Sequence, residues 1–442
     1  MKVGIVSLGC PKNLTDTEVI LGKLAAAGHE ITNNERDADV LIINTCAFIK
    51  PAIDEAMSEI KRAIKLKQKG HIKYLVVAGC LPQRQKIKMA DVDAWVGSGN
   101  IDKIVDVVKN LGRSPRFPIP DTRSPSQRSC LFDHKTPRIK ATPRHYAYIK
   151  IADGCDNRCT YCTVPNIRGP FKSRPTEDIV AEAKILARSG TKELILVAQD
   201  TTNYGTDLYS KLMLPALLKK LCRIPGLKWI RIMYAHPDHM TDELIKVIAK
   251  EKKIVKYIDL PIQHICDNIL KLMGRRVSKR KIIDLIAKIR RSIPAITIRT
   301  TFIVGFPGET RSDFKELLDF IKKERFERLG IFAYSAEEGT PAANLRGKLP
   351  ETVKISRFRQ AMRLQNQISK KLNEEKRNKV FEVLVDSKAG KGFIGRTASD
   401  APEIDGSVVI SPPYGGHIKV GDFVSVKVKR ASAYDLFGAL IT

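Results

Sequence analysis

The segment at residues 146–164, YAYIKIADGCDNRCTYCTV, sets the interpretation of the whole chain. A strand-like apolar run, 146–151, leads into a loop with three cysteines, Cys155, Cys159 and Cys162, spaced C-x3-C-x2-C. Three thiolates can hold three irons of a four-iron cluster and leave the fourth without a protein ligand. That open iron can chelate the amino and carboxylate groups of S-adenosylmethionine, whose reductive cleavage yields a 5′-deoxyadenosyl radical. The spacing therefore favours radical chemistry over a zinc or purely structural site.

Alternating strand and helix patterns follow this loop. Strand-like runs occur at 194–198, 229–233, 257–260, 296–304 and 330–334, and helical patterns occur between them at 176–189, 212–222, 242–249, 279–291 and 312–324. Together with 146–151 they make about six β/α units, which predicts a partial (β/α)6 barrel with its site at the carboxyl edge of the strands. The polar residues after these strands are Gln199, Asp200, His236, Gln263, His264 and Glu309.

Three further cysteines follow three apolar runs in the N-terminal part of the chain. The runs VGIVSL (3–8), VLIIN (40–44) and YLVVA (74–78) precede Cys10, Cys46 and Cys80, and helix-compatible sequence follows each. This β-α repetition predicts a parallel sheet, in which the carboxyl ends of the strands form the ligand crevice. Three thiols at one edge can hold a second iron–sulfur cluster. Zinc with an outside fourth ligand, or three buried small hydrophobes, are the alternatives.

Composition divides the chain of 442 residues into three parts. A proline-rich stretch at 113–145 separates residues 1–125 from a core at 141–372, and short β-like segments fill 373–442. The net charge of +29 is uneven: +5 on 1–125, +23 on 126–372 and +1 on 373–442. No apolar run is long enough to span a membrane, so a cytoplasmic protein with reduced thiols is expected. Cys130, Cys222 and Cys266 lack ligand spacing.

The cysteine loop in its β/α setting resembles the radical S-adenosylmethionine (SAM) superfamily. With Cys10, Cys46 and Cys80 added, the chain resembles the methylthiotransferases, which have an N-terminal cluster domain, a radical core and a small C-terminal antiparallel TRAM β-barrel. Four motifs resemble the RimO branch, which modifies ribosomal protein S-twelve at the β-carbon of an aspartate: SLGCPKN (7–13), VAQDTTNYG (197–205), IRTTFIVGFPGET (298–310) and YDLFGA (434–439).

The resemblance implies two [4Fe-4S] clusters and SAM as cofactors. Cys155, Cys159 and Cys162 would hold the radical cluster, and Cys10, Cys46 and Cys80 the auxiliary one. Lys12 and Asp200 are the catalytic candidates, with Lys12 orienting the substrate carboxylate. The candidates for cofactor binding are Arg168, Arg174, Gln199 and Glu309. An electron donor such as a flavodoxin or ferredoxin is implied as a partner.

The distribution of charge bears on the substrate. The tail barrel carries only +1, which suits it poorly as the main grip on RNA phosphates. The basic core instead favours a ribosomal protein presented beside rRNA, on the small subunit or an assembly intermediate. Two alternatives stay open: a tRNA (adenosine 2-position) methylthiotransferase of the MiaB type, and a non-catalytic RNA-binding iron–sulfur protein.

Overall fold

The N-terminal part of the computed structural model is a six-stranded, wholly parallel sheet. The structure describes residues 1–85, 87, 89–113, 117–119, 130–411 and 418–441. The strand order is β2-β1-β3-β4-β5-β6. The strands are β1 (Lys2–Ser7), β2 (Glu30–Thr32), β3 (Val40–Thr45), β4 (Tyr74–Gly79), β5 (Ala94–Gly97) and β6 (Phe117–Ile119). The three predicted runs are therefore the neighbouring strands β1, β3 and β4.

Helices bury both faces of this sheet, which explains why the central strand β3 has no exposed residue. Ile20 and Leu24 of α1 (Pro11–Ala26) and Ile104 of α4 (Ile104–Lys109) pack on one face. Ala56 and Ile60 of α2 (Lys50–Gln68) pack on the other, near the short α3 (Cys80–Arg84). Three short strands have no counterpart among the predicted runs: β2, β5 and β6.

A second parallel sheet of six strands forms the centre of the molecule, in the order β14-β13-β12-β11-β10-β7. Its strands are β7 (Tyr146–Lys150), β10 (Glu193–Val197), β11 (Trp229–Ile232), β12 (Ile254–Asp259), β13 (Thr297–Val304) and β14 (Arg328–Ala333). Its main helices are α6 (Thr176–Arg188), α8 (Leu214–Cys222), α9 (Asp242–Lys250), α11 (Lys279–Ser292), α12 (Arg311–Glu324) and α13 (Glu351–Glu374). Because β7 and β14 are the two edges and do not pair, the sheet is the predicted partial barrel.

Shorter elements occupy the loops of the central sheet. They are β8 (Ala152–Asp153), β9 (Lys172–Ser173), α5 (Val164–Arg168), α7 (Thr206–Tyr209) and α10 (Asp267–Leu272). The strands β8 and β9 pair antiparallel on either side of the cysteine loop. None of the helices in the described part of the chain is long and apolar enough to cross a membrane.

The C-terminal segment forms a closed five-stranded barrel, β15-β16-β17-β19-β18. The strands are β15 (Val380–Ala389), β16 (Gly392–Thr397), β17 (Val408–Ile410), β18 (Phe423–Ala431) and β19 (Leu436–Leu440). The expectation of an antiparallel barrel is wrong at one pair, since β17 and β19 run parallel. A closed ring with an odd number of strands cannot alternate direction all the way round, so at least one pair must be parallel.

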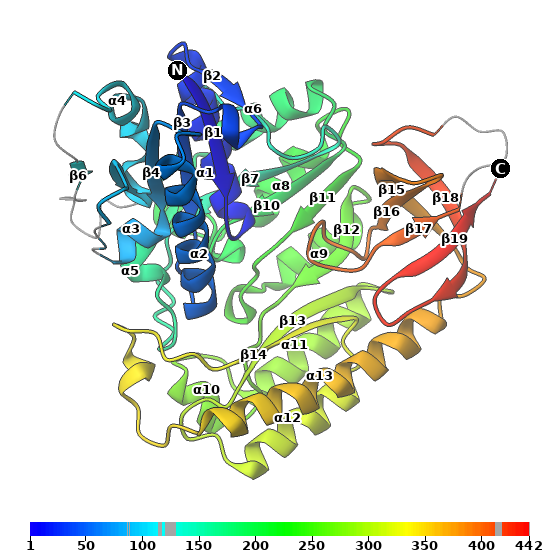
Figure 1. Ribbon diagram of the computed structural model, residues 1–442. Coiled ribbons are helices and arrows are strands. Elements are labelled where there is room, and N and C mark those ends of the chain that lie inside the picture. The colour runs from blue at the N-terminus through cyan, green and yellow to red at the C-terminus, as the bar shows by residue number, and fades with distance from the viewer. Residues whose placement is uncertain (86, 88, 114–116, 120–129, 412–417, 442) are drawn as a thin grey trace.

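The three parts lie side by side, with the N-terminal sheet on the left of Figure 1, the barrel on the right and the central sheet between them. Buried ion pairs join the barrel to the central sheet. Arg396 of β16 donates to Glu193 of β10 at 2.6 Å, and Arg328 of β14 pairs with Asp400.

The described part of the proline-rich stretch, 130–145, is irregular and packs between α1 and α6. The Arg138 guanidinium donates to Glu18 of α1 at 2.8 Å and also pairs with Glu182 of α6. The rest of the predicted linker includes 114–116 and 120–129, which lie outside the described residues.

Candidate active site

The first cysteine triad lies along one edge of the N-terminal sheet. Cys10 precedes α1 directly after β1, Cys46 follows β3, and Cys80 begins α3 after β4. Because these strands are parallel neighbours, their carboxyl ends bring the three cysteines together, as the sequence predicts. All three thiols are free and partly accessible.

Gly9 allows the loop after β1 to approach Cys46 closely. Gly9 has a left-handed φ of +94°, and a Cβ placed on it would lie 2.5 Å from the Cβ of Cys46 and 3.1 Å from its Sγ. Any larger residue at position 9 would therefore push Cys46 out of the triad.

The second triad lies on the loop between β8 and α5, at the carboxyl end of β7. Backbone hydrogen bonds fix this loop: Cys155 N donates to Gly169 O at 3.2 Å, and Thr160 N donates to Met273 O at 2.9 Å. Cys155, Cys159 and Cys162 are partly accessible and free, like the first triad. The cysteine loop is thus held by α5 on one side and α10 on the other.

The donor set of both triads fits an iron–sulfur cluster better than a single ion. Zinc–sulfur bonds of about 2.3 Å bring tetrahedral thiolates within about 4 Å of each other. In the described chain, groups of possible ligands within 4.8 Å occur at Asp200, His236 and His239, and at Cys266, Asp313 and Glu316, but at neither triad. Burial raises the pKa of Cys46 and of Cys155 to about 12, so a metal must supply the charge that makes these thiols thiolates.

The two triads belong to sheet edges that face each other. Glu337, which follows β14, accepts from Arg84 of α3 at 2.9 Å and from Lys50 N at the start of α2 at 2.9 Å. Thr163 Oγ1, next to Cys162, donates to Phe48 O at 3.1 Å, two residues after Cys46. These contacts join the loops that carry the two triads.

Lys12 is in the first turn of α1, two residues after Cys10, and its charge acts on both triads. Burial raises the pKa of the Cys162 thiol, and the Lys12 ammonium opposes this shift. Burial acts in the same direction on Cys10, but the Lys12 charge, the backbone N–H groups of Asn13 and Lys12, and the Arg168 charge together outweigh it, so the pKa of Cys10 is lowered. Lys12 therefore acts electrostatically on one cysteine of each triad.

Arg168 faces the first triad rather than the second. It is buried, and its guanidinium donates to Asp16 at 2.7 Å and to Cys80 Sγ at 3.4 Å. Asp16 also pairs with Lys150 of β7, so a buried charge network connects α1 to the central sheet beside the auxiliary triad.

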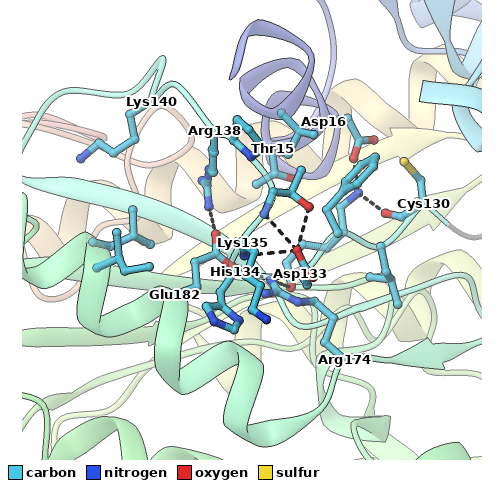
Figure 2. A pocket seen from close by; sticks show the side chains of 18 of the residues that line it. Thr15, Asp16, Cys130, Asp133, His134, Lys135, Arg138, Lys140, Arg174 and Glu182 are labelled. Carbon is cyan, nitrogen blue, oxygen red and sulfur yellow. Dashed lines mark hydrogen bonds and ion pairs between the residues drawn. The ribbon is translucent and has the colours of Figure 1, made fainter. Parts of the chain in front are cut away.

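Arg174 lies in the wall of a cavity of about 470 Å³ between α1, residues 131–140 and α6 (Figure 2). Its guanidinium donates to Asp178 at 2.6 Å, to Glu182 at 2.6 Å and to Lys150 O at 2.9 Å. Since two carboxylates already hold this arginine, we propose no cofactor contact for it. Arg138 in the same wall is paired as well, with Glu18 and Glu182.

Gln199 and Asp200 lie beside the second triad, at the carboxyl end of β10. Asp200 accepts from Asn157 Nδ2 of the cysteine loop at 2.7 Å and from His239 Nδ1 at 2.8 Å. Its pKa is lowered to about 2, because the hydrogen bond and charge of His239, the charge of His236 and the hydrogen bond from Thr202 outweigh its burial. Gln199 donates to Asp153 at 2.7 Å, while its buried Oε1 has no partner. An unpartnered buried acceptor at this edge suits a bound cofactor that supplies a donor.

Glu309 closes the loop after β13. Its carboxylate accepts from the backbone N–H groups of Gly305 and of Phe306, the latter at 3.0 Å, and pairs with Arg357 of α13 at 2.9 Å. It therefore shapes the GFPGET loop.

Sequence reasoning missed Arg275, which is buried beside the second triad. Its Nη1 donates to His236 Nε2 at 2.7 Å and lies 3.9 Å from Cys159 Sγ. Burial and the Arg275 charge lower the pKa of His236 to about 3, so the neutral imidazole is the acceptor. Arg275 belongs to a run of basic residues after α10, and no feature of that run separates it from its exposed neighbours.

Comparison with known proteins agrees with this architecture. Three family models match: the Radical SAM superfamily over residues 149–321, the Uncharacterized protein family UPF0004 over 2–97, and the TRAM domain over 379–441. A ribosomal protein uS12 methylthiotransferase RimO from Pelotomaculum thermopropionicum is 48% identical over 100% of this chain and 99% of its own length. The RimO of Desulforamulus reducens is 46% identical over 99% of each chain.

Solved structures support the fold alone. The radical S-adenosylmethionine methyltransferase TsrM from Kitasatospora setae matches 77% of this chain and 76% of its own with a TM-score of 0.59 at 14% identity. Identity of 44–48% over the full length of eight relatives, with all three family models in order, shows that the chain belongs to the RimO family of radical SAM methylthiotransferases.

Proposed function

We propose that this chain is the enzyme that transfers a methylthio group to the β-carbon of an aspartate in ribosomal protein uS12. The observation that carries the proposal is the pair of cysteine triads on two facing sheet edges, in a chain with full-length RimO relatives. Two clusters at one site suit a reaction that needs both a radical and a sulfur donor.

The residues present fit two [4Fe-4S] clusters and SAM. Cys155, Cys159 and Cys162 would hold the radical cluster, and Cys10, Cys46 and Cys80 the auxiliary one. When bound, these groups supply the radical that activates an unactivated C–H bond and the sulfur that replaces the hydrogen.

The protein positions the reactants. We assign to Lys12 the orientation of the substrate carboxylate, because it follows Cys10 by two residues, its charge acts on a cysteine of each triad, and an ammonium attracts a carboxylate. Asp200 holds the cysteine loop through Asn157, and Gln199 offers its free Oε1 to the cofactor. Arg168 stabilises the negative charge of the auxiliary triad through Cys80.

The basic central part favours uS12 presented beside rRNA, on the small subunit or an assembly intermediate. Lys271, Arg276 and Lys281 are exposed near the start of α11, and none of them takes part in the ion pairs of the described chain. Binding to small subunits should weaken steeply with salt, while tight, salt-insensitive binding to free uS12 alone would contradict this presentation.

The domain ranges, the electron donor and the location of the reaction belong to the same proposal. We propose domains at 1–125, 141–372 and 373–442, which the grouping of the strands into two sheets and one barrel supports. A flavodoxin or ferredoxin would supply the electron, and the reaction would occur in the cytoplasm, where ribosomes are assembled.

Mass spectrometry tests the substrate directly. Ribosomal proteins from cells with and without this chain should differ by one methylthio group on an aspartate of uS12. The same mass difference on tRNA, with uS12 unchanged, would instead support the MiaB-type alternative. A protein that binds RNA but yields no 5′-deoxyadenosine with dithionite and SAM would support the non-catalytic alternative.

A further inference from the structure

Tyr234 lies at the carboxyl edge of the central sheet, two residues after β11, and contacts Lys12 of the N-terminal part. The Lys12 ammonium lies 3.3 Å from the centroid of the Tyr234 ring. This distance is well within the range of about 6 Å over which an aromatic face attracts a cation. The contact joins the segment after Cys10 to the edge of the central sheet.

The backbone at Tyr234 is strained and firmly held. Its φ of +60° is in the left-handed region, which is unusual for a bulky residue. Tyr234 N donates to Asp259 Oδ2 at 2.9 Å, and Tyr234 O accepts from Thr201 N at 3.0 Å. Asp259 is fully buried and is itself held by Arg299 at 2.7 Å. Strain of this kind persists where the surroundings fix it, and it concentrates at functional sites.

The contact with the Tyr234 ring does not neutralise the Lys12 ammonium, so its charge stays available to a substrate. None of the ion pairs between described residues includes Lys12, although the site around it is rich in buried carboxylates that pair with other cations. A lysine has a flexible four-carbon stem, so without a support its ammonium would sample many positions.

We propose that Tyr234 is a positioning residue: its ring holds the Lys12 ammonium at the carboxyl edge of the central sheet, where the ammonium meets the carboxylate of the substrate aspartate. This inference rests on the proposed function. The left-handed backbone turns the ring toward Lys12, and Asp259 and Thr201 fix that orientation before the substrate binds. Tyr234 thereby contributes to the preference for a carboxylate substrate without itself contacting the reacting atoms.

Two substitutions distinguish the effect of the Tyr234 ring from the effect of its left-handed backbone. Tyr234→Asn removes the ring but tolerates the left-handed conformation, because asparagine is enriched there. Tyr234→Phe keeps the ring. Tyr434→Asn, at a tyrosine that is 50% exposed on the barrel, is the matched control. Iron content and thermal midpoint of each variant report whether the fold and both clusters are retained.

The assay measures binding of cluster-loaded protein to small subunits that carry either uS12 or uS12 with the modified aspartate replaced by asparagine. Tyr234→Asn should weaken binding of the aspartate form about ten-fold, the equivalent of about 1.4 kcal/mol for one cation–π contact. Its affinity for the asparagine form should stay within about two-fold, and Tyr234→Phe and Tyr434→Asn should match the wild type.

Other outcomes would contradict the role of Tyr234, the role of Lys12 or the proposed function, and each can be told apart. Equal losses for both forms would show a merely structural role for Tyr234 and overturn the inference, as would an unchanged Tyr234→Asn variant. If the Lys12→Met variant also keeps the preference for the aspartate form, the assignment of substrate orientation to Lys12 is wrong. Wild-type enzyme that leaves uS12 unmodified would overturn the proposed function itself.

Discussion

Replacement of Glu193 by glutamine should loosen the TRAM barrel from the central sheet. Glu193 is fully buried on β10 and accepts from Arg231 at 2.8 Å and from Arg396 of the barrel at 2.6 Å. Arg231 is also fully buried, and its other contacts are Ala398 O at 3.0 Å and the ring of Tyr257. The substitution keeps the shape of the side chain but removes the only carboxylate that pairs with Arg231 in the described chain.

The expected cost follows from this geometry. Removing one partner of a buried ion pair leaves an uncompensated charge and costs about 3–5 kcal/mol. At about 1.4 kcal/mol per factor of ten, the population with an undocked barrel should rise by about two to three and a half orders of magnitude. The amides of β15 and β16 bond to neighbouring strands of the barrel, so their native-state hydrogen exchange reports undocking through the easier opening of the undocked barrel.

The chain offers a matched control at the same interface. Glu382 of β15 pairs with Lys228 at 2.6 Å, but the two side chains are 48% and 46% exposed. An exposed pair contributes about 0–1 kcal/mol, so Glu382→Gln should change the exchange by less than about six-fold. If Glu193→Gln protects the barrel amides as well as Glu382→Gln does, the buried network does not hold the barrel and the reasoning is refuted.

Three further predictions concern the clusters and the barrel. Reconstituted wild-type protein should contain about eight irons, and the Cys46→Ala and Cys159→Ala variants about four each. SAM cleavage should survive in Cys46→Ala and be lost in Cys159→Ala. Wild-type protein with only about four irons would contradict the presence of two clusters. Gly9→Ala should also reduce the iron content to about four, because its Cβ would displace Cys46, whereas an unchanged iron content would show that the loop can adapt. The barrel should undock in acid. Burial raises the pKa of Asp400, but the charges of Arg328 and Lys376 and the hydrogen bond from Thr397 outweigh burial, so the pKa is lowered. The Arg328–Asp400 pair therefore stabilises docking fully above the ordinary carboxylate value of about 4, and this contribution is lost as the pH falls through the lowered pKa. Protection factors of the barrel amides, which correct for the pH dependence of the intrinsic exchange rate, would disprove this if they stayed constant as the pH falls from about 7 through the acid range.

The sequence by itself determined the parts of the site that depend on local patterns. The C-x3-C-x2-C spacing and the apolar runs before Cys10, Cys46 and Cys80 predicted both triads and their sheet edges, because parallel strands place their carboxyl ends together whatever their order. Alternation of strands and helices likewise predicted the partial barrel, since its apolar runs and helical patterns recur in turn along the chain.

Only the tertiary structure decided which charged side chains contact the cysteine triads. Arg168 and Arg174 are six residues apart and equally basic, yet one donates to Cys80 while the other pairs with Asp178 and Glu182 across a different cavity. Tyr234 meets Lys12, more than two hundred residues away, only because the two sheet edges face each other. Such partners come from distant elements packed together, and the attraction between them depends on distance and burial, which local sequence does not encode.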